Sequence, residues 1–351
     1  MNKEATQETV SDETLLDVND LKVHFPIIRG ILRRQVGTVK AVDGVSFAIR
    51  RGETLGLVGE SGCGKTTTGR AIARVFQPTG GAIRFRSDDG NLFDVGSLEG
   101  KELHDYWKNV QVVFQDPYSS LNPRRTVMQL IGEPLMLLGG MEARERDKRV
   151  RELLDMVGLD ARHAERYPHA FSGGQRQRIG IARGIALNPS LIIADEAVSA
   201  LDVSVQGQVL NLMIKLQREL GLTYLFISHD LGVVKHVSDR IAVMYLGKLV
   251  ELASYRRLFR NPKHPYTEAL LSAVPRPDPE HTLKRMVLKG EVADPAHRPT
   301  GCPFHTRCPY AQDVCRSEEP ELRTFGSGED EQQVACHFAE SLSLTAARGD
   351  H

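Results

Sequence analysis

The chain has 351 residues, with 45 Lys and Arg against 45 Asp and Glu, so its formal net charge at pH 7 is +0. Hydrophobic residues make up 41% and charged residues 26%, which is ordinary for a globular protein and excludes a mainly disordered chain. The length suggests one large domain and a smaller one. A balanced charge gives no reason to expect nucleic acid as a partner.

No apolar stretch reaches the roughly 18 residues that a membrane-spanning helix needs. Residues 1–20 are expected to form a polar N-terminal tail, without the basic and apolar regions of a signal peptide. The sequence therefore predicts a protein that stays in the cytosol. Its five cysteines are expected to be thiols or metal ligands there.

Strands alternate with helices along most of the chain. Apolar residues at period 2 predict a strand over 39–49, and a second strand over 54–58 leads through a glycine-rich loop into a helix. This alternation implies a mainly parallel sheet and an α/β fold. We place a domain boundary near Pro275, beyond which proline is frequent and four cysteines follow. The later elements are predicted as strands over 110–114, 191–194 and 222–228 and helices over 127–159 and 172–187.

The residues between the second strand and its helix match a phosphate-binding loop. Glycines let the backbone fold around an anion, and the helix N-terminus adds partial positive charge. Lys65 is expected to reach the β- and γ-phosphates of a nucleotide, and the Thr66 hydroxyl to hold Mg²⁺. Cys63 lies where the motif accepts any residue, so it needs no catalytic role. The loop consists of Gly59, Glu60, Ser61, Gly62, Cys63, Gly64, Lys65, Thr66 and Thr67.

Two adjacent acids, Asp195 and Glu196, follow the buried run 191–194. Ligands of α/β sheets bind at the carboxyl ends of strands, so Asp195 can reach a phosphate-bound Mg²⁺ there. Glu196 can then act as the general base for a water that attacks the γ-phosphate. The alternative is a helix N-cap followed by an acid in the first turn. Together with the phosphate loop, the two acids favour nucleotide hydrolysis.

A further motif is formed by Phe171, Ser172, Gly173, Gly174 and Gln175. It resembles the signature of the ABC-transporter ATPases, with Phe171 in place of the commoner Leu. Gln115 is similar to the Q-loop glutamine of this family, Asp202 to the D-loop aspartate and His229 to the switch histidine. The resemblance covers about residues 21–253. The signature residues are Ser172, Gly173, Gly174 and Gln175.

The resemblance implies a P-loop NTPase fold with a RecA-like core, an antiparallel β subdomain and a helical subdomain inserted at about 116–187. The cassette is expected over 21–275. In the family two cassettes pack head to tail, and the signature helix of one caps the γ-phosphate of ATP held by the other. The N–H groups that Ser172 places at its helix start fit this second anion site.

The same resemblance implies catalytic roles for Glu196, His229 and Gln115. His229 is expected to contact the γ-phosphate and to orient the attacking water. Gln115 is expected to be a third Mg²⁺ residue beside Thr66 and Asp195, and to tie the helical insert to the ATP site. The family stacks adenine on an aromatic residue upstream of the phosphate loop, and Phe25 is the nearest candidate. A core or surface phenylalanine remains an equal alternative. Basic residues over 29–40 are expected in an extended, solvated loop.

Three stretches, 114–123, 199–206 and 261–267, resemble the ATP-binding subunits of oligopeptide and dipeptide importers, whose relatives also carry nickel. The insertion over 29–40 suggests the F-type subunit, which pairs with a non-identical homologue. The implied partners are that second ATP-binding subunit, two membrane permease subunits and an extracytoplasmic solute-binding protein. The chain is then peripheral at the cytoplasmic face of the membrane. Ala197 departs from the proline usual in this branch, which puts the local loop in doubt.

The predicted C-terminal extension, 276–351, carries four cysteines. Their spacing lacks the close Cys-x2-Cys pairs of structural zinc sites. Four thiolates can hold a [4Fe–4S] cluster, and similar importer subunits carry one in this tail; zinc and free thiols stay open as alternatives. The residues are Cys302, Cys308, Cys315 and Cys336.

Functions outside transport fit the sequence less well. A soluble ABC protein acting on DNA needs a long coiled coil, and the interval from Lys65 to Ser172 leaves no room for one. A translation-type protein carries two cassettes, whereas this chain has one. A nucleotide kinase leaves the second anion site unexplained. A cassette for nickel or another small solute stays open.

Overall fold

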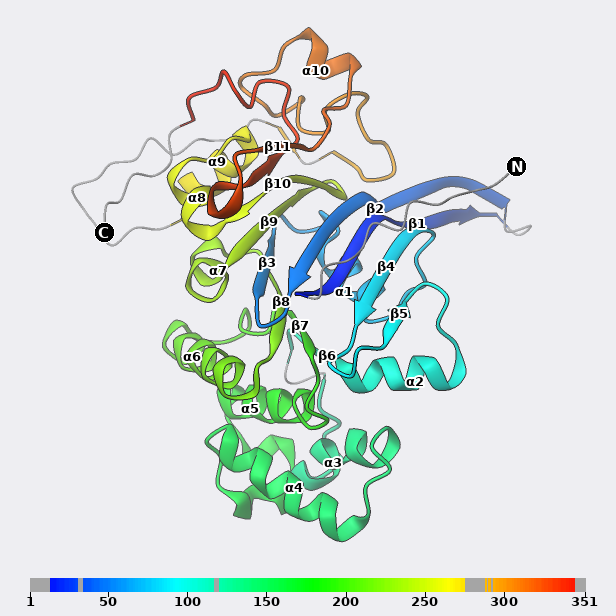
Figure 1. The fold of residues 1–351 in the computed structure, drawn as a ribbon, viewed down its shortest axis with the longest axis vertical. Helices are drawn as coiled ribbons and strands as arrows, with labels where there is room; N and C mark the ends of the chain where they lie inside the picture. The colour runs from blue at the N-terminus through cyan, green and yellow to red at the C-terminus, as the bar shows by residue number, and fades with distance from the viewer. Residues whose placement is uncertain are drawn as a thin grey trace, which may run out of the picture.

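Two β-sheets organise the molecule (Figure 1), which is described by a computed structural model over residues 13–30, 34–116, 120–274, 288, 290–291 and 293–344. The smaller sheet is antiparallel, in the order β2 (Arg34–Arg50), β1 (Thr14–Arg29), β4 (Gly80–Arg86) and β5 (Leu92–Asp94). The larger sheet has the order β11 (Arg323–Phe325), β12 (Gln332–Val334), β10 (Lys248–Ser254), β9 (Arg240–Tyr245), β3 (Thr54–Val58), β8 (Thr223–Ser228), β7 (Leu191–Asp195) and β6 (Val110–Val113).

Strands β9, β3, β8, β7 and β6 run parallel, and β10, β12 and β11 continue the larger sheet antiparallel. The predicted α/β fold with a mainly parallel core sheet is therefore confirmed. The helices are α1 (Lys65–Ile72), α2 (Gly100–Asn109), α3 (Val127–Leu137), α4 (Ala143–Met156), α5 (Gly173–Gly184), α6 (Val203–Leu220), α7 (Leu231–Val237), α8 (Tyr255–Arg260), α9 (Pro265–Ser272) and α10 (Asp313–Ser317), with 3-10 turns at Ala161–Glu165, Pro168–Ala170 and Gly328–Asp330.

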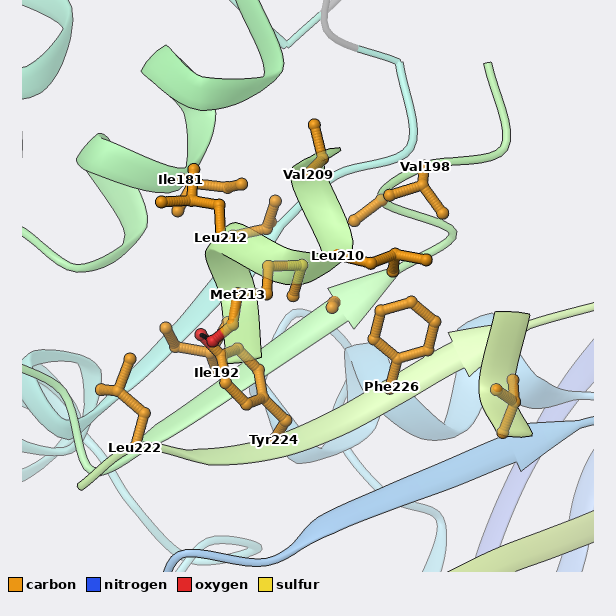
Figure 2. Close-up of a cluster of buried hydrophobic side chains, with 14 of the residues drawn as sticks. Ile181, Ile192, Val198, Val209, Leu210, Leu212, Met213, Leu222, Tyr224 and Phe226 are labelled. Carbon is orange, nitrogen blue, oxygen red and sulfur yellow. Dashed lines mark hydrogen bonds between the residues drawn. The ribbon is translucent and has the colours of Figure 1, made fainter. Parts of the chain in front are cut away.

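The two faces of the larger sheet are buried in different cores. Tyr224 and Phe226 of β8 pack with the helical side, whereas Leu225 and Ile227 pack with α1 and the smaller sheet. This period-2 alternation is that of a strand covered on both faces. Figure 2 shows the helical side, where side chains of α5 and α6 cover β7 and β8. Its labelled residues are Ile181, Ile192, Val198, Val209, Leu210, Leu212, Met213, Leu222, Tyr224 and Phe226.

Strand β1 was not predicted from the sequence. It begins at Thr14, inside the stretch expected to be a polar tail, and Leu16 and Val18 are buried. Several register shifts against β2 break the regular alternation, so period 2 is obscured in the sequence. Arg29 pairs with Arg34 and Lys40 with His24, so these described residues of the basic segment lie in paired strands rather than in the extended loop we expected.

Strands β11 and β12, which follow α9 in the chain, join the larger sheet at its edge. β12 pairs with β10. Cys302 and Phe304 belong to the core that also contains side chains of α3, α4, α5 and α6. The predicted boundary near Pro275 lies outside the described residues. Within the described ranges, no helix combines the length and the apolar character that crossing a membrane requires.

Candidate nucleotide-binding and hydrolysis site

Four predicted site elements meet at one edge of the larger sheet. Because β6, β7, β8 and β3 are adjacent and parallel, their carboxyl ends lie together, which is where α/β sheets bind ligands. Gln115 lies just beyond β6, and Asp195 ends β7 with Glu196 next to it. His229 follows β8, and Gly59 opens the loop after β3.

The loop between β3 and α1 requires glycine at two places. Gly59 has a φ of 152°, and a Cβ there would lie 2.2 Å from the Met244 carbonyl oxygen. Gly64 caps α1 with a φ of 106°, and its Cβ would lie 2.4 Å from the Ala41 carbonyl oxygen. Only a residue without a side chain fits such positions. The backbone therefore turns tightly into the N-terminus of α1.

Lys65 and Thr66 are held inside this loop. Lys65 is buried, and its Nζ donates to the carbonyls of Gly59 at 2.7 Å and Glu60 at 3.0 Å. The Thr66 hydroxyl donates to Asp195 Oδ1 at 2.9 Å, which joins the phosphate loop directly to the end of β7. Burial raises the pKa of Asp195, and the bond from Thr66 opposes that rise. A hydroxyl beside a carboxylate is an oxygen set that suits Mg²⁺.

Glu196 and His229 come together across neighbouring strands. Glu196 Oε2 lies 3.3 Å from His229 Nδ1, with the carboxylate side chain 17% exposed and the imidazole 56% exposed. The Glu196 backbone N–H donates to the Ile227 carbonyl at 2.9 Å, and its φ is 50°. This left-handed backbone conformation is strained for a residue other than glycine, and such strained residues cluster at functional sites. The arrangement places a carboxylate and an imidazole at the same edge as the phosphate loop.

The signature motif opens α5 with a capping box. Ser172 Oγ accepts from the Gln175 backbone N–H at 3.4 Å, and Gln175 Oε1 accepts from the Ser172 N–H at 3.1 Å. Gly174 packs so close to α6 that a Cβ would lie 2.4 Å from Val205 Cγ1. Gly173 is less crowded, because a Cβ there would lie at an ordinary contact distance of 3.5 Å from Leu201 Cδ2.

The two expected anion sites lie on opposite sides of the larger sheet. Ala71 and Ile72 of α1 belong to the core on one face, and Ile179 and Ile181 of α5 belong to the core on the other. In Figure 1, α5 lies beside α6 and near α3 and α4. Within one chain, the signature helix and the phosphate loop therefore serve separate surfaces.

Three other predicted residues occupy simple positions. Phe25 is half-buried in β1, and its ring meets that of Phe76 edge-on at 5.5 Å between centroids. Asp202 is exposed and caps α6 through its backbone. Cys63 is buried 3.7 Å from Lys65 Nζ, and burial raises the pKa of its thiol.

The four C-terminal cysteines line one small apolar cavity. Burial raises the pKa of Cys302 to about 12 and that of Cys308 to about 11. Among the described residues, no group of three or more His, Cys, Asp or Glu is arranged to hold a metal ion. The predicted iron–sulfur cluster therefore has no support in this arrangement, and zinc has none either. The cysteines are Cys302, Cys308, Cys315 and Cys336.

One contact to the loop was missed by the sequence analysis. Arg307 forms an ion pair with Glu60, and Tyr266 accepts a hydrogen bond from the Glu60 backbone. Tyr266 belongs to the stretch 261–267, which gave no sign of this contact, and Arg307 lies in no motif and is 247 positions from Glu60 in the sequence.

Comparison with known proteins agrees with this geometry. Residues 42–199 match the family model described as ABC transporter, and residues 250–315 match the C-terminal region of the oligopeptide/dipeptide transporter. The chain is similar to the oligopeptide transport ATP-binding protein AppF of Bacillus subtilis (strain 168), with 54% identity over 93% of this chain and 98% of that protein. It is 47% identical to the dipeptide transport ATP-binding protein DppF of Escherichia coli (strain K12), over 95% of this chain and 96% of that protein.

A solved structure of the ATP-binding cassette MJ0796, a dimer in a post-hydrolysis state with ADP and phosphate, superposes with a TM-score of 0.59. It is 29% identical and covers 69% of this chain and 99% of its own. Fold and site thus define an ATP-hydrolysing ABC cassette. Within that class, the chain belongs to the family of oligopeptide and dipeptide transporter ATP-binding proteins.

Proposed function

We propose that this chain powers the import of oligopeptides or dipeptides as one of two ATP-binding cassettes of a transporter. The names of its relatives and the match of residues 250–315 to the transporter C-terminal region support this substrate class. Two membrane permeases, a solute-binding protein and a second, non-identical cassette complete the proposed assembly. The chain then works at the cytoplasmic face of the membrane, with a cassette over 21–275 and an extension over 276–351.

The residues at the sheet edge divide the work on ATP. Lys65 exchanges its bonds with the loop carbonyls for the β- and γ-phosphates, and the loop N–H groups hold the phosphate oxygens. Glu196 accepts the proton of the attacking water. His229, 3.3 Å from that carboxylate, contacts the γ-phosphate and orients the attacking water. Gln115, just beyond the end of β6, senses the metal and connects the helical insert to this site.

Thr66 and Asp195 are the residues that would hold Mg²⁺. Their oxygen atoms lie 2.9 Å apart, and the hydroxyl and carboxylate fit the preference of this ion for oxygen ligands. When bound there, Mg²⁺ would neutralise negative charge on the phosphates. We propose Phe25 as the adenine-stacking residue, since its ring is half-buried in β1.

ATP turnover in this proposal needs two cassettes. The phosphate loop and the signature helix lie on opposite faces of the sheet, which supports a site shared between chains. The helix start at Ser172 then caps the γ-phosphate held by a partner, and Asp202 lies at the same interface. Hydrolysis removes the shared phosphate and lets the pair open. The dimeric state of the similar cassette MJ0796 agrees with this scheme.

The cysteines of the extension have no step in this mechanism. A [4Fe–4S] cluster stays a prediction, and iron content with visible absorbance near 400 nm of anaerobically purified protein measures it directly. Absence of both iron and absorbance contradicts the prediction.

The single observation that carries the proposal is the meeting of Thr66 with Asp195 and of Glu196 with His229 at one sheet edge. The test is ATP hydrolysis by the assembled transporter in lipid vesicles, with solute-binding protein and peptide added. We expect peptide to accelerate hydrolysis and to accumulate across the membrane. Hydrolysis indifferent to peptide, with no accumulation, refutes peptide import.

A further inference from the structure

The C-terminal extension reaches the phosphate loop through one arginine. Arg307 donates from Nη1 to Glu60 Oε2 at 2.6 Å and from Nη2 to Glu60 Oε1 at 3.1 Å. The arginine side chain is 8% exposed and the carboxylate 29% exposed, so water screens the pair only in part. Two parallel charge-assisted bonds fix the orientation of a carboxylate as well as its distance.

Glu60 is also held at its backbone. Its N–H donates to the Tyr266 hydroxyl at 2.8 Å, and Tyr266 is fully buried in α9. The ring of Tyr266 packs on Tyr245 and Phe304, with centroids 4.7 Å and 5.4 Å away. The Arg307 guanidinium lies 6.0 Å from the centroid of the Tyr245 ring. Both groups that bind Glu60, the Arg307 guanidinium and the Tyr266 hydroxyl, therefore belong to or pack against the aromatic cluster of Tyr245, Tyr266 and Phe304.

The Glu60 carbonyl is one of two loop carbonyls that hold the Lys65 ammonium group. Glu60 follows Gly59, the first residue after β3, and the carbonyls of both residues accept from Lys65 Nζ. A rotation of the Glu60 peptide moves the lysine and reorients the loop N–H groups.

Arg307 is fixed in turn by a series of tight turns from Cys302 to Cys308. The Arg307 N–H donates to the Phe304 carbonyl at 3.0 Å, and the His305 N–H donates to the Cys302 carbonyl at 3.0 Å. The Cys302 N–H donates to the Cys315 carbonyl at 2.8 Å, which ties these turns to the rest of the extension. The path from the extension to the loop is therefore continuous.

We propose that Arg307 is a positioning residue for nucleotide binding, which holds Glu60, and through it the phosphate loop, in the conformation that receives ATP. The extension is then a working part of the ATP site. This inference rests on the proposed function, because it assigns Arg307 a role in binding the nucleotide that the phosphate loop holds.

The test measures the MgATP dissociation constant of the full-length chain by fluorescence titration. Arg307→Gln is expected to weaken binding about tenfold, within the range of ordinary coupling between sites. Arg307→Lys keeps the charge but loses the paired bonds, so it is expected to weaken binding less. Glu60→Gln should resemble Arg307→Gln, and the double variant should bind no more weakly than either single variant. In the assembled transporter, Arg307→Gln should raise KM for ATP and leave kcat nearly unchanged.

Arg323→Gln is the matched control. Arg323 also belongs to the extension, but it donates to the Cys336 carbonyl at 2.9 Å instead of reaching the loop. This variant should lower the melting temperature and leave the MgATP affinity as in the wild type.

Three results overturn the inference: unchanged MgATP affinity in Arg307→Gln, effects of the two single variants that multiply in the double variant, or an equal loss of affinity in Arg323→Gln. If Arg307→Gln fails to fold, Arg307→Lys gives the same decision, since wild-type affinity in that variant together with unchanged affinity in Glu60→Gln also overturns the inference. A wild-type chain that binds no MgATP refutes the proposed function and, with it, this role of Arg307.

Discussion

Replacing Glu196 with Gln isolates the proposed general base. The glutamine amide has the shape of the glutamate carboxylate and keeps an oxygen that can face His229. In the wild type the Glu196 carboxylate lies 3.3 Å from His229. The bond from the residue 196 N–H to the Ile227 carbonyl is made by the backbone and is not altered. The fold and the phosphate loop should therefore be retained, while the acceptor for the proton of water is lost.

The expected loss follows from that single change. General base catalysis typically contributes about 10²–10⁴-fold in rate, which corresponds to about 3–5 kcal/mol of transition-state free energy. The affinity for ATP should stay near that of the wild type, because Lys65 and Thr66 are untouched. With ATP bound and not hydrolysed, the closed pair of cassettes should accumulate.

The assay measures phosphate release, ATP affinity and the elution volume on size exclusion with and without MgATP. Glu219→Gln is the control, since Glu219 is 51% exposed on α6 and pairs only loosely with Lys215, 3.7 Å away. It should hydrolyse ATP at the wild-type rate. Normal turnover by Glu196→Gln would show that another group accepts the proton.

Three further predictions concern the loop, the signature and the buried acid. Lys65→Ala should raise the MgATP dissociation constant about 10–100-fold, as loss of a charged hydrogen bond predicts, and an unchanged constant speaks against the loop. Gly174→Ala should destabilise the fold by about 1–3 kcal/mol by overpacking, because its Cβ meets Val205 Cγ1 at 2.4 Å; melting should recover when Val205→Ala is added, and a single variant as stable as the wild type contradicts the contact. Burial raises the pKa of Asp195 in the folded protein. Protonated Asp195 therefore stabilises the folded state fully below the unfolded pKa of about 4, and this stabilisation is lost as the pH rises through the raised pKa. Asp195→Asn should therefore melt above the wild type at pH 7, with a smaller gain at pH 4, yet lose Mg²⁺-dependent hydrolysis; equal gains at both pH values contradict the sign.

The site residues could be predicted where a short continuous stretch of sequence specifies both the local structure and the chemistry. A buried strand, a glycine loop and a helix specify the position of Lys65 and Thr66, and a buried strand that ends in acids specifies Asp195. The rule that parallel strands present their carboxyl ends together then predicts that Thr66 and Asp195 approach, although 129 positions separate them.

What the sequence concealed depends on irregular or distant geometry. Register shifts hide the alternation of β1, so its buried Leu16 was assigned to a tail. The ion pair of Glu60 and Arg307 joins two segments that share no motif, and no periodic pattern in the sequence predicts it. The positive φ of Glu196 is imposed by its tertiary setting, because propensity alone disfavours it.

The specific ATPase activity of the full chain with its partner cassette, measured over a wide dilution series, tests the shared ATP site most directly. Sedimentation at each concentration gives the fraction of paired cassettes. We expect the activity per chain to fall with that fraction and to vanish when only monomers remain. Activity per chain that stays constant in fully monomeric protein contradicts a site built from two chains.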